Sequence, residues 1–395
     1  MVSKACVVGA YQRKLEELAA SGVDLTVVVP PYWQEETRRI PLERLHTRGY
    51  RLVVEPIRFN GRFHLFYFPG LGHIVHDVRP DIVHADEEPY NPATWHMIRL
   101  ARQAGAKALF FTWQNLYRRY APPFSWIERY CLESADRAIA GNAEAVEVLH
   151  RKGFARPIDV IPQFGVDPDI FKPSTVSGQP SAVNYQSSII SQQNPEPRTQ
   201  NLEPPTHPSA LSAPPSFRIG YVGRLVEQKG ILDLVEATAR LKGAYTLVLV
   251  GAGPLQPAIT ARATELGARD RVELLGGVPS SQMPEILNSL DVLVLPSRTR
   301  ANWKEQFGRA LVEAMACEVA VVGSDSGEIP NVIGDAGLIF PEGSVDALAA
   351  HLDALSASPD LRRTLGARGR ARVLERFTQA RIAQQTFRVY QEMLG

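Results

Sequence analysis

Two cationic side chains in the second half of the chain are placed where they could bind a phosphorylated ligand. Arg224 and Lys229 lie in the segment Gly-Tyr-Val-Gly-Arg-Leu-Val-Glu-Gln-Lys-Gly at residues 220–230. A guanidinium binds phosphate as a fork, and an ammonium binds it as a point charge. The segment follows a predicted strand and precedes a predicted helix over 231–241, so its backbone N–H groups would face the carboxyl edge of a sheet. Taken alone, the same two residues would also suit a solvated surface loop.

A second segment supplies two carboxylates and a helix N-terminus. Glu305 precedes a predicted helix, and Glu313 lies about two turns further on, off its apolar stripe. The residues of that stripe recur at helical spacing: Phe307, Ala310, Leu311, Ala314 and Met315. Free N–H groups at Phe307 and Gly308 would suit a diphosphate, and Gly308 has no side chain to block its approach. By themselves, the two glutamates could equally be a helix-dipole partner and a solvated helix face.

The two segments together predict a site for a sugar nucleotide between Arg224 and Glu313. A carboxylate on a helix can accept both hydroxyls of a ribose, as acidic residues do in dinucleotide-binding folds. A second carboxylate before the helix, Glu305, could hold a sugar hydroxyl beside the diphosphate.

Short β-branched runs alternate with helical patterns along nearly the whole chain, which predicts parallel sheets built from βαβ units. The strands expected in the first half are 5–8, 25–29, 51–55, 81–84, 108–112, 137–140 and 159–161. Those expected in the second half are 218–222, 246–250, 272–275, 292–295, 319–322 and 338–340. Helices are expected over 13–20, 92–104, 359–375 and 381–394. Each half is therefore predicted to be a Rossmann-like domain.

The composition changes abruptly between the halves. Residues 174–216 are rich in Ser, Pro, Gln and Asn, and we expect a disordered insertion or linker there; a partner-recruiting segment is the alternative. We expect a domain over 1–173 that binds an acceptor and a domain over 217–376 that binds a nucleotide sugar. A helix over 377–395 is expected to pack across the hinge between them.

Bulk properties exclude few classes of protein. The 395 residues suffice for two domains, and the net charge of +1 gives no reason to expect nucleic acid. Cys6, Cys131 and Cys317 are far apart, without metal-ligand spacing, which is typical of buried thiols in a reducing compartment. No signal peptide or membrane span is expected. The expectation is a cytoplasmic protein, with peripheral contact at the inner face of a membrane left open.

The sequence resembles the retaining glycosyltransferases of family 4, which have the GT-B fold. The resemblance rests on two glutamates separated by seven residues, Glu305 and Glu313, and on Gly-Arg-Leu-x-x-x-Lys-Gly at 223–230. Further matches are Val-Leu-Val-Gly-Ala-Gly-Pro at 248–254, Leu-Pro-Ser at 295–297 and Gly-Ser-Asp-Ser-Gly-Glu-Ile-Pro at 323–330. The first half matches more loosely, through Val-Ile-Pro at 160–162, Gly-Val-Asp at 165–167 and Phe-x-Pro at 171–173.

The resemblance implies an α/β protein whose two Rossmann-like domains face each other across a cleft, with the C-terminal helix crossing back to the first domain. Arg224 and Lys229 would stabilise the departing nucleoside diphosphate without a metal or cofactor. Glu305 would orient the donor sugar as a catalytic residue, and Glu313 would hold the ribose. The other donor-binding residues implied are Gly9, Gly223, Gly276, Gly277, Val278, Phe307 and Gly308.

The implied reaction transfers a hexose from a UDP- or GDP-sugar, with retention of configuration, to a hydroxyl of a glycan, glycolipid or small molecule. Polysaccharide or glycolipid assembly is the implied context. Two alternative functions are compatible with the same fold. One is a nucleotide-sugar epimerase or phosphorylase, and the other is a non-catalytic scaffold that binds a sugar nucleotide.

The chain departs from the family pattern in three places. Only Gly9 remains of the usual glycine-rich turn after the first strand. The region after the fifth strand, Thr-Trp-Gln-Asn at 112–115, lacks the usual histidine, so Gln114 or Asn115 could contact the sugar instead. A turn usually served by Gly and Pro contains Glu318 and Ala320, which puts its local geometry in question.

Several residues of the first half are compatible with more than one role. Asp86 and Asn142 are further candidates for acceptor or sugar contact. The segment Asp-Glu-Glu at 86–88 could bind an acceptor hydroxyl or a cation, but its composition favours a solvated acidic turn. His84 is predicted to be a core histidine, and residues 63–68 are predicted to form a buried strand. The mixture of aromatic and basic residues over 113–130 could form an acceptor cleft, a surface for anionic lipid, or simple loop packing.

Overall fold

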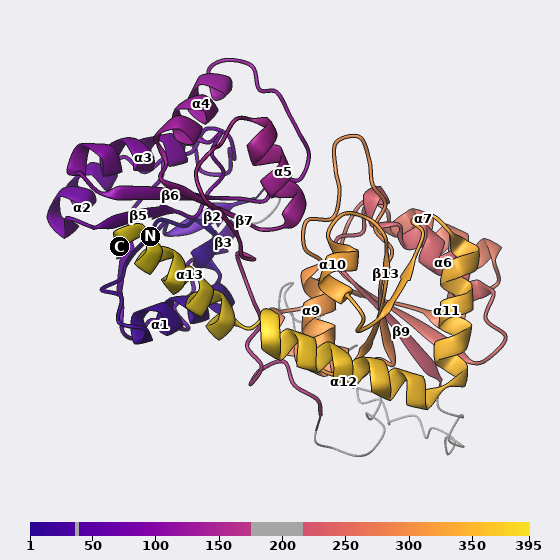
Figure 1. Ribbon diagram of the computed structural model, residues 1–395. Helices are drawn as coiled ribbons and strands as arrows, with labels where there is room; N and C mark the ends of the chain where they lie inside the picture. Colours follow the sequence, from indigo (N-terminus) through magenta and orange to yellow (C-terminus); the bar gives the residue numbers. More distant parts are fainter. Residues whose placement is uncertain (36–38, 175–215) are drawn as a thin grey trace, which may run out of the picture.

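The computed structural model describes residues 1–35, 39–174 and 216–395, and it shows two α/β domains side by side (Figure 1). Apart from Ser174 and Ser216, the segment expected to be a disordered insertion lies outside the described residues.

The second domain is built on one six-stranded parallel sheet with the strand order β11-β10-β9-β12-β13-β14. The strands are β9 (Phe217–Val222), β10 (Tyr245–Val250), β11 (Val272–Gly276), β12 (Val292–Leu295), β13 (Ala320–Ser324) and β14 (Leu338–Phe340). This is the 3-2-1-4-5-6 order of doubly wound folds, which bind ligands where the order reverses. In this sheet the reversal falls between β9 and β12.

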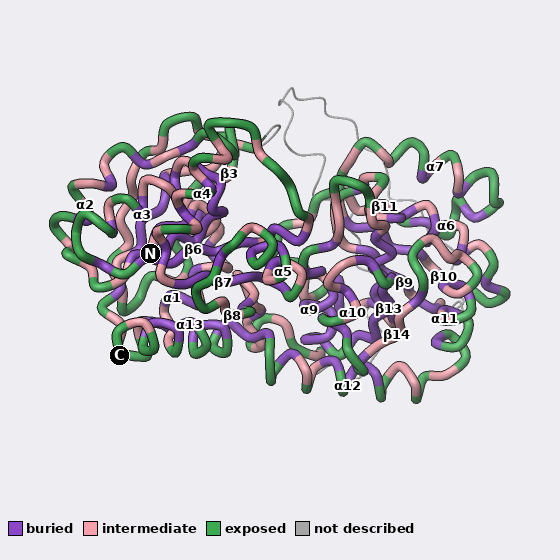
Figure 2. The backbone as a smooth tube through the Cα atoms, turned by 45° about the horizontal axis from the view of Figure 1, so that its top comes forward, coloured by how far each residue is buried: buried purple, intermediate pink, exposed green. Residues whose placement is uncertain are grey.

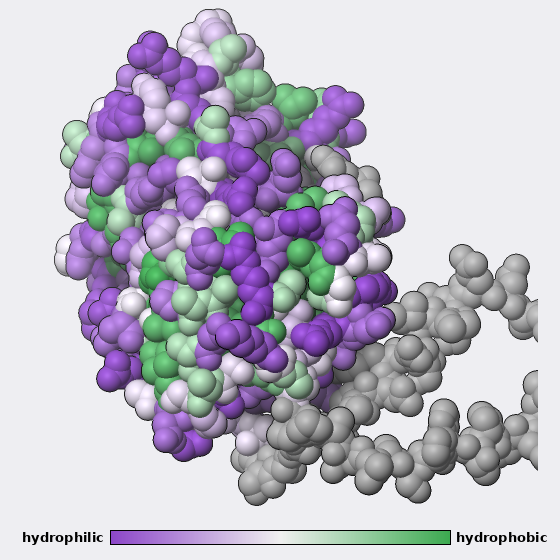
Figure 3. All heavy atoms as spheres, turned by 90° about the vertical axis from the view of Figure 1, so that its right-hand side faces the viewer, coloured by the Kyte–Doolittle hydropathy of each residue, from purple (hydrophilic) through white to green (hydrophobic). Residues whose placement is uncertain are grey.

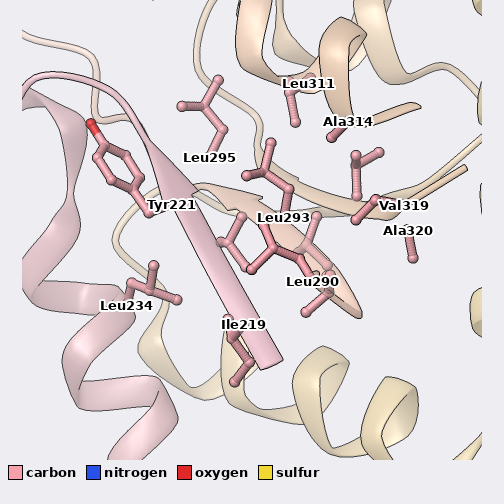
Figure 4. Close-up of a cluster of buried hydrophobic side chains, with 14 of the residues drawn as sticks. Ile219, Tyr221, Leu234, Leu290, Leu293, Leu295, Leu311, Ala314, Val319 and Ala320 are labelled. Carbon is pink, nitrogen blue, oxygen red and sulfur yellow. The ribbon is translucent and has the colours of Figure 1, made fainter. Parts of the chain in front are cut away.

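Helices cover this sheet on both faces. They are α6 (Ile231–Ala239), α7 (Gln256–Glu265), α8 (Met283–Asn288), α9 (Arg309–Ala316), α10 (Ile329–Ile333), α11 (Val345–Ala357) and α12 (Pro359–Arg376). Figure 4 shows how Leu293 and Leu295 of β12 pack beside Leu311 and Ala314 of α9. All the strands predicted in this half are present, because apolar β-branched runs are typical of strands buried on both faces.

The first domain contains a parallel sheet in two parts, β1-β4 and β5-β6-β7-β8, and a small antiparallel pair, β2-β3. The strands are β1 (Thr26–Val29), β2 (Tyr32–Gln34), β3 (Arg39–Pro41), β4 (Arg51–Val54), β5 (Ile82–Ala85), β6 (Lys107–Thr112), β7 (Arg137–Ala140) and β8 (Ile158–Val160). The helices are α1 (Arg13–Ala20), α2 (Leu71–Val78), α3 (Pro92–Ala104), α4 (Phe124–Ser134) and α5 (Ala143–Arg151).

The strand predicted over residues 5–8 is wrong. Residues Ala5–Val7 form a 3₁₀ turn, and Val2 instead bridges the two parts of the sheet through isolated bridges to Val28 and Ala85. The backbone N–H of Val2 donates to His84 and that of Ser3 donates to Val28, so the bonds that a central strand would make are made by the first three residues. An apolar cavity of about 340 Å³ continues the line of this short strand, between α2 and the C-terminal helix.

The strand predicted over residues 63–68 is also wrong, and only the second half of the segment is buried. Phe66 and Phe68 are fully buried, whereas Phe63 and Leu65 are more than a third exposed. The segment makes only an isolated bridge, from Tyr67 to Arg58. Two aromatic side chains therefore anchor an irregular loop to the core without a neighbouring strand along its length.

The chain returns to the first domain at its C-terminus, as expected. Helix α12 packs on the second domain and α13 (Gln379–Leu394) packs against α1 of the first (Figure 1). At the crossing, Val166 N–H donates to Phe377 and Gln379 N–H donates to Val166. A side chain at Gly165 would come within 2.5 Å of the Phe377 carbonyl oxygen, so only glycine permits this close approach.

Buried positions follow the strands of both sheets, while exposed positions lie mainly on helices and loops (Figure 2). The outer face of the second domain is largely hydrophilic, with apolar side chains in small groups (Figure 3). The three cysteines are buried and free. In the part of the chain that the structure describes, no helix has both the length and the apolar character needed to cross a bilayer.

Candidate active site

The two segments singled out in the second domain meet at the point where the strand order reverses. Arg224 and Lys229 follow β9, and Glu305 follows β12, the adjacent strand. A cavity of about 260 Å³ opens there, and it is lined by Gly223, Arg224, Lys229, Trp303, Lys304, Glu305 and Gln306. The three side chains expected to be catalytic therefore share one cavity.

Lys229 and Glu305 form the central pair of this cavity. Lys229 Nζ lies 2.5 Å from Glu305 Oε2, and Ser297 Oγ donates to the same oxygen at 2.9 Å. The two charged side chains are 14% and 10% exposed, which is little for an ion pair. Lys229 Nζ also lies 4.8 Å from the ring centroid of Trp303, a cation–π contact. The ammonium is thus held at the cavity wall by contacts on two sides.

Two glycines allow the loops of the cavity to approach each other. A Cβ on Gly230, which has φ +64°, would come within 1.9 Å of the Pro296 carbonyl oxygen. A Cβ on Gly327 would come within 2.2 Å of the Glu305 carbonyl oxygen. Glycine is required at both positions, because a side chain at either one would displace the facing backbone, next to Lys229 or at Glu305.

Glu313 lies on α9, and its carboxylate is paired with an arginine that the sequence reasoning missed. Arg309 Nε donates to Glu313 Oε1 at 2.7 Å, and Arg309 also bonds to Tyr11 Oη of the first domain. The spacing in the sequence could have indicated this pair, because side chains four residues apart on a helix are neighbours. Helix α9 begins at Arg309 rather than at Phe307, because Gly308 has φ +78°.

The remaining donor-site residues lie outside the lining of the cavity. Phe307 packs between Trp113 and Phe377. Residues Gly276, Gly277 and Val278 lie at the carboxyl end of β11, and a Cβ on either glycine would meet only open space.

Gly9 is engaged within the first domain. Its N–H donates to Glu43 Oε2 at 2.7 Å, and a Cβ there would come within 2.5 Å of Leu45. A carboxylate therefore already occupies the backbone donor that was expected to face a diphosphate.

Two of the four acceptor-side candidates contact residues 305–306 of the second domain directly. Asn115 Nδ2 donates to the Glu305 carbonyl at 3.2 Å, and Asn142 Nδ2 donates to the Gln306 carbonyl at 3.0 Å. In return, Gln306 Nε2 donates to the Trp113 carbonyl at 3.0 Å. These three bonds, which we call the interdomain clasp, hold residues 305–306 against the first domain.

The other two acceptor-side candidates face the interior of their own domain. Gln114 bonds to Tyr120 Oη and to Lys152 Nζ. Asp86 is 1% exposed and accepts a hydrogen bond from Ser3 Oγ at 2.7 Å. His84 is a core histidine as expected, bonded to Tyr390 Oη at 2.7 Å, and burial lowers its pKa to about 3.

The favoured reading of 86–88 as a solvated acidic turn is wrong, since Asp86, Glu87 and Glu88 are all buried. Glu88 accepts from Thr112 Oγ1 at 2.6 Å and from the Trp113 N–H at 2.8 Å. Burial raises the pKa of Glu88 to about 7, against the opposing effect of these two bonds. Glu88 therefore positions the loop that carries Asn115, which no local pattern had indicated.

Comparisons with known proteins agree with this arrangement. The family model described as Glycosyltransferase Family 4 matches residues 12–170, and the model described as Glycosyl transferases group 1 matches residues 206–372. An alpha-maltose-1-phosphate synthase of Mycolicibacterium smegmatis is 35% identical over 44% of this chain and 48% of its own length. An N-acetyl-alpha-D-glucosaminyl L-malate synthase of Bacillus anthracis is 33% identical over 44% of this chain and 45% of its own length. The chain thus spans about half the length of the curated relatives it matches.

Among solved structures, Anabaena HepE in complex with UDP superposes with a TM-score of 0.70, at 18% identity, over 99% of this chain and 98% of that chain. This match covers both domains and shows the shared fold. The two family models account for both domains of the α/β architecture described above. The chain belongs to the group 1, family 4 glycosyltransferases, with the GT-B fold.

Proposed function

We propose that this protein is a retaining glycosyltransferase that transfers a hexose from a nucleoside-diphosphate sugar to an acceptor hydroxyl. The observation that carries the proposal is the Lys229–Glu305 pair, in one cavity with Arg224 at the strand-order reversal. Such crevices are where open α/β sheets bind nucleotides. The UDP bound to HepE and the sugar products in the names of the relatives support the donor class.

Arg224 and Lys229 would stabilise the negative charge that builds on the departing diphosphate. These two cationic side chains would supply the charge that a metal ion would otherwise provide. Glu305 would accept a hydroxyl of the donor sugar. Glu313 would take the ribose hydroxyls, with Arg309 holding its carboxylate in place.

The reaction then needs no base from the protein. The bond between the anomeric carbon and the phosphate oxygen breaks, and the acceptor oxygen bonds to the same face of that carbon. The acceptor's proton passes to the leaving diphosphate, so configuration is retained and charge is balanced.

The test is release of nucleoside diphosphate from a panel of UDP- and GDP-sugars, with and without candidate acceptors. Lys229→Ala and Glu305→Gln are each expected to lower turnover by roughly 100-fold or more. Lys242→Ala and Glu285→Gln are matched controls, because both residues are exposed in the same domain. Turnover that survives Lys229→Ala unchanged would refute the site, and inactivity on every donor would refute the reaction.

A further inference from the structure

A second recess on the first domain has a charge imbalance that the donor site does not explain. It measures about 650 Å³ and lies between residues 117–120, α4 and the end of α5. Six cationic side chains line it: Arg118, Arg119, Arg129, Arg151, Lys152 and Arg156. The lining contains two carboxylates, Glu128 and Glu133.

One of these carboxylates is already neutralised. Glu128 Oε1 is bonded to Lys152 Nζ, and this ion pair is largely buried at the base of the recess. Burial raises the pKa of Glu128, while Lys152 opposes that rise. Neither residue is therefore available to balance the arginines.

The arginines themselves remain without a carboxylate partner. Over residues 1–35, 39–174 and 216–395, none of the five forms an ion pair, whereas arginines elsewhere, such as Arg137, Arg298 and Arg309, do. Arg118 donates to a neutral carbonyl, that of Asn302, and Arg151 lies 4.4 Å from the ring centroid of Tyr117. Five guanidinium groups around one remaining carboxylate, Glu133, favour a multiply charged anion, above all phosphate.

The recess adjoins the donor cavity. Gln114 binds Lys152 at the base of the recess, and the next residue, Asn115, binds the Glu305 carbonyl at the cavity. Arg118 also connects the recess to the donor cavity. It lines the recess and donates to the carbonyl of Asn302, the residue before the cavity-lining Trp303. A molecule bound in the recess would thus lie beside the segment that lines the donor cavity, where the proposed sugar transfer takes place.

We propose that this recess binds a phosphate group carried by the acceptor, so that a hydroxyl of the same molecule reaches the donor cavity. The proposal rests on the function proposed above for the identity of the acceptor, but the binding of phosphate does not. The phosphate could belong to a soluble phosphorylated sugar or to a lipid headgroup, since the recess would recognise the same chemistry in both.

The experiment compares the unmodified chain with Arg129→Ser/Arg156→Ser. Arg368→Ser/Arg388→Ser is the matched control, which removes two exposed arginines far from the recess. Glucose 1-phosphate, followed by titration calorimetry, probes the soluble source. Co-sedimentation with vesicles of equal parts phosphatidylglycerol and phosphatidylcholine, against phosphatidylcholine alone, probes the lipid source.

We expect one probe to bind, and the recess variant to weaken it by roughly tenfold per arginine while the control binds normally. The probe that binds identifies the source of the phosphate. Binding of neither probe, or equal binding by the recess variant and the control, overturns the proposal. UDP-induced thermal stabilisation is measured in parallel and should be the same in all three proteins. Its absence in all of them would count against the proposed donor site and leave the phosphate result readable.

Discussion

Lys229 and Glu305, which are 76 residues apart in the chain, meet with 2.5 Å between Nζ and Oε2 at the carboxyl ends of two adjacent strands. Each group compensates the buried charge of the other. In the function proposed above, the same two groups contact the diphosphate and the sugar, so a bound donor would compete with the ion pair for them. On that proposal, donor binding would loosen a pair that also stabilises the fold.

This coupling predicts the stability of the pair's variants. Lys229→Met and Glu305→Gln should each lower the free energy of unfolding by about 2 kcal/mol, because each leaves one partially buried charge unpaired. The double variant should lose less than the sum of the two, since it buries no unpaired charge. Urea unfolding of the four proteins measures this cycle, and strict additivity would contradict a direct interaction.

The interdomain clasp can be separated from local helix stability at Asn142. Asn142 Oδ1 accepts from the Ala145 N–H as the N-cap of α5, while Nδ2 donates to Gln306 across the domain interface. Asn142→Asp keeps the cap but cannot donate, and it sets a buried carboxylate against the Gln306 carbonyl oxygen, so it should weaken the domain interface and lower turnover. Asn142→Ala loses both bonds and should also cost about 1 kcal/mol of stability. Equal turnover in the Asp variant and the unmodified enzyme would show that the clasp has no part in catalysis.

For protein prepared with Met1 as its first residue, the buried amino group of Met1 predicts a pH dependence of stability. Its nitrogen donates to the Thr26 carbonyl at 2.8 Å, and burial lowers the pKa of the ammonium from 8.0 to about 6. Between these values the unfolded chain holds a proton that the folded chain does not, so stability is lost as the pH falls from 8 to 6. The expected loss in free energy of unfolding is about 3 kcal/mol. Urea unfolding at the two pH values measures it, once mass spectrometry has verified that Met1 is retained.

Adding Val-Ile-Val before Met1 is the control. In the register set by Val2, these three residues would run alongside residues 24–26 of one strand and 81–83 of the other, and they would fill the apolar cavity. The amine would move out of the sheet, so the slope between pH 6 and 8 should disappear and stability should rise. A Gly-Ser-Gly extension should also remove the slope but stabilise less. If both extensions stabilise equally, the cavity does not select an apolar strand.

The turn after α9 predicts a stabilising substitution. Glu318 has φ +60°, a left-handed conformation that costs a non-glycine residue roughly 1 kcal/mol. Glu318→Gly should therefore raise the free energy of unfolding by about 1 kcal/mol. Glu318→Ala retains a Cβ and is expected to bring no such gain, which separates backbone strain from loss of the carboxylate. Thermal unfolding of both variants decides between these outcomes.

Local sequence was sufficient to predict the strands of the second domain and to single out the two segments of its candidate site. Apolar strands and an amphipathic helix are encoded within a few residues, and ligands of parallel sheets bind at the ends of strands, so Arg224, Lys229 and Glu305 could be placed at one edge from their positions alone. The unusual backbone at Glu318 was also foreseeable, because a turn that usually contains glycine contains a residue with a side chain.

The tertiary structure alone decided burial and every contact across the cleft. The acidic turn at 86–88 is buried because Lys4, Ser3 and the end of β6 surround it, and no short pattern records such neighbours. The same holds for the clasp formed by Asn115 and Asn142, whose partners lie more than 160 residues away. Sequence patterns carry information about the local backbone and its apolar face, whereas hydrogen bonds between distant segments depend on how two domains pack.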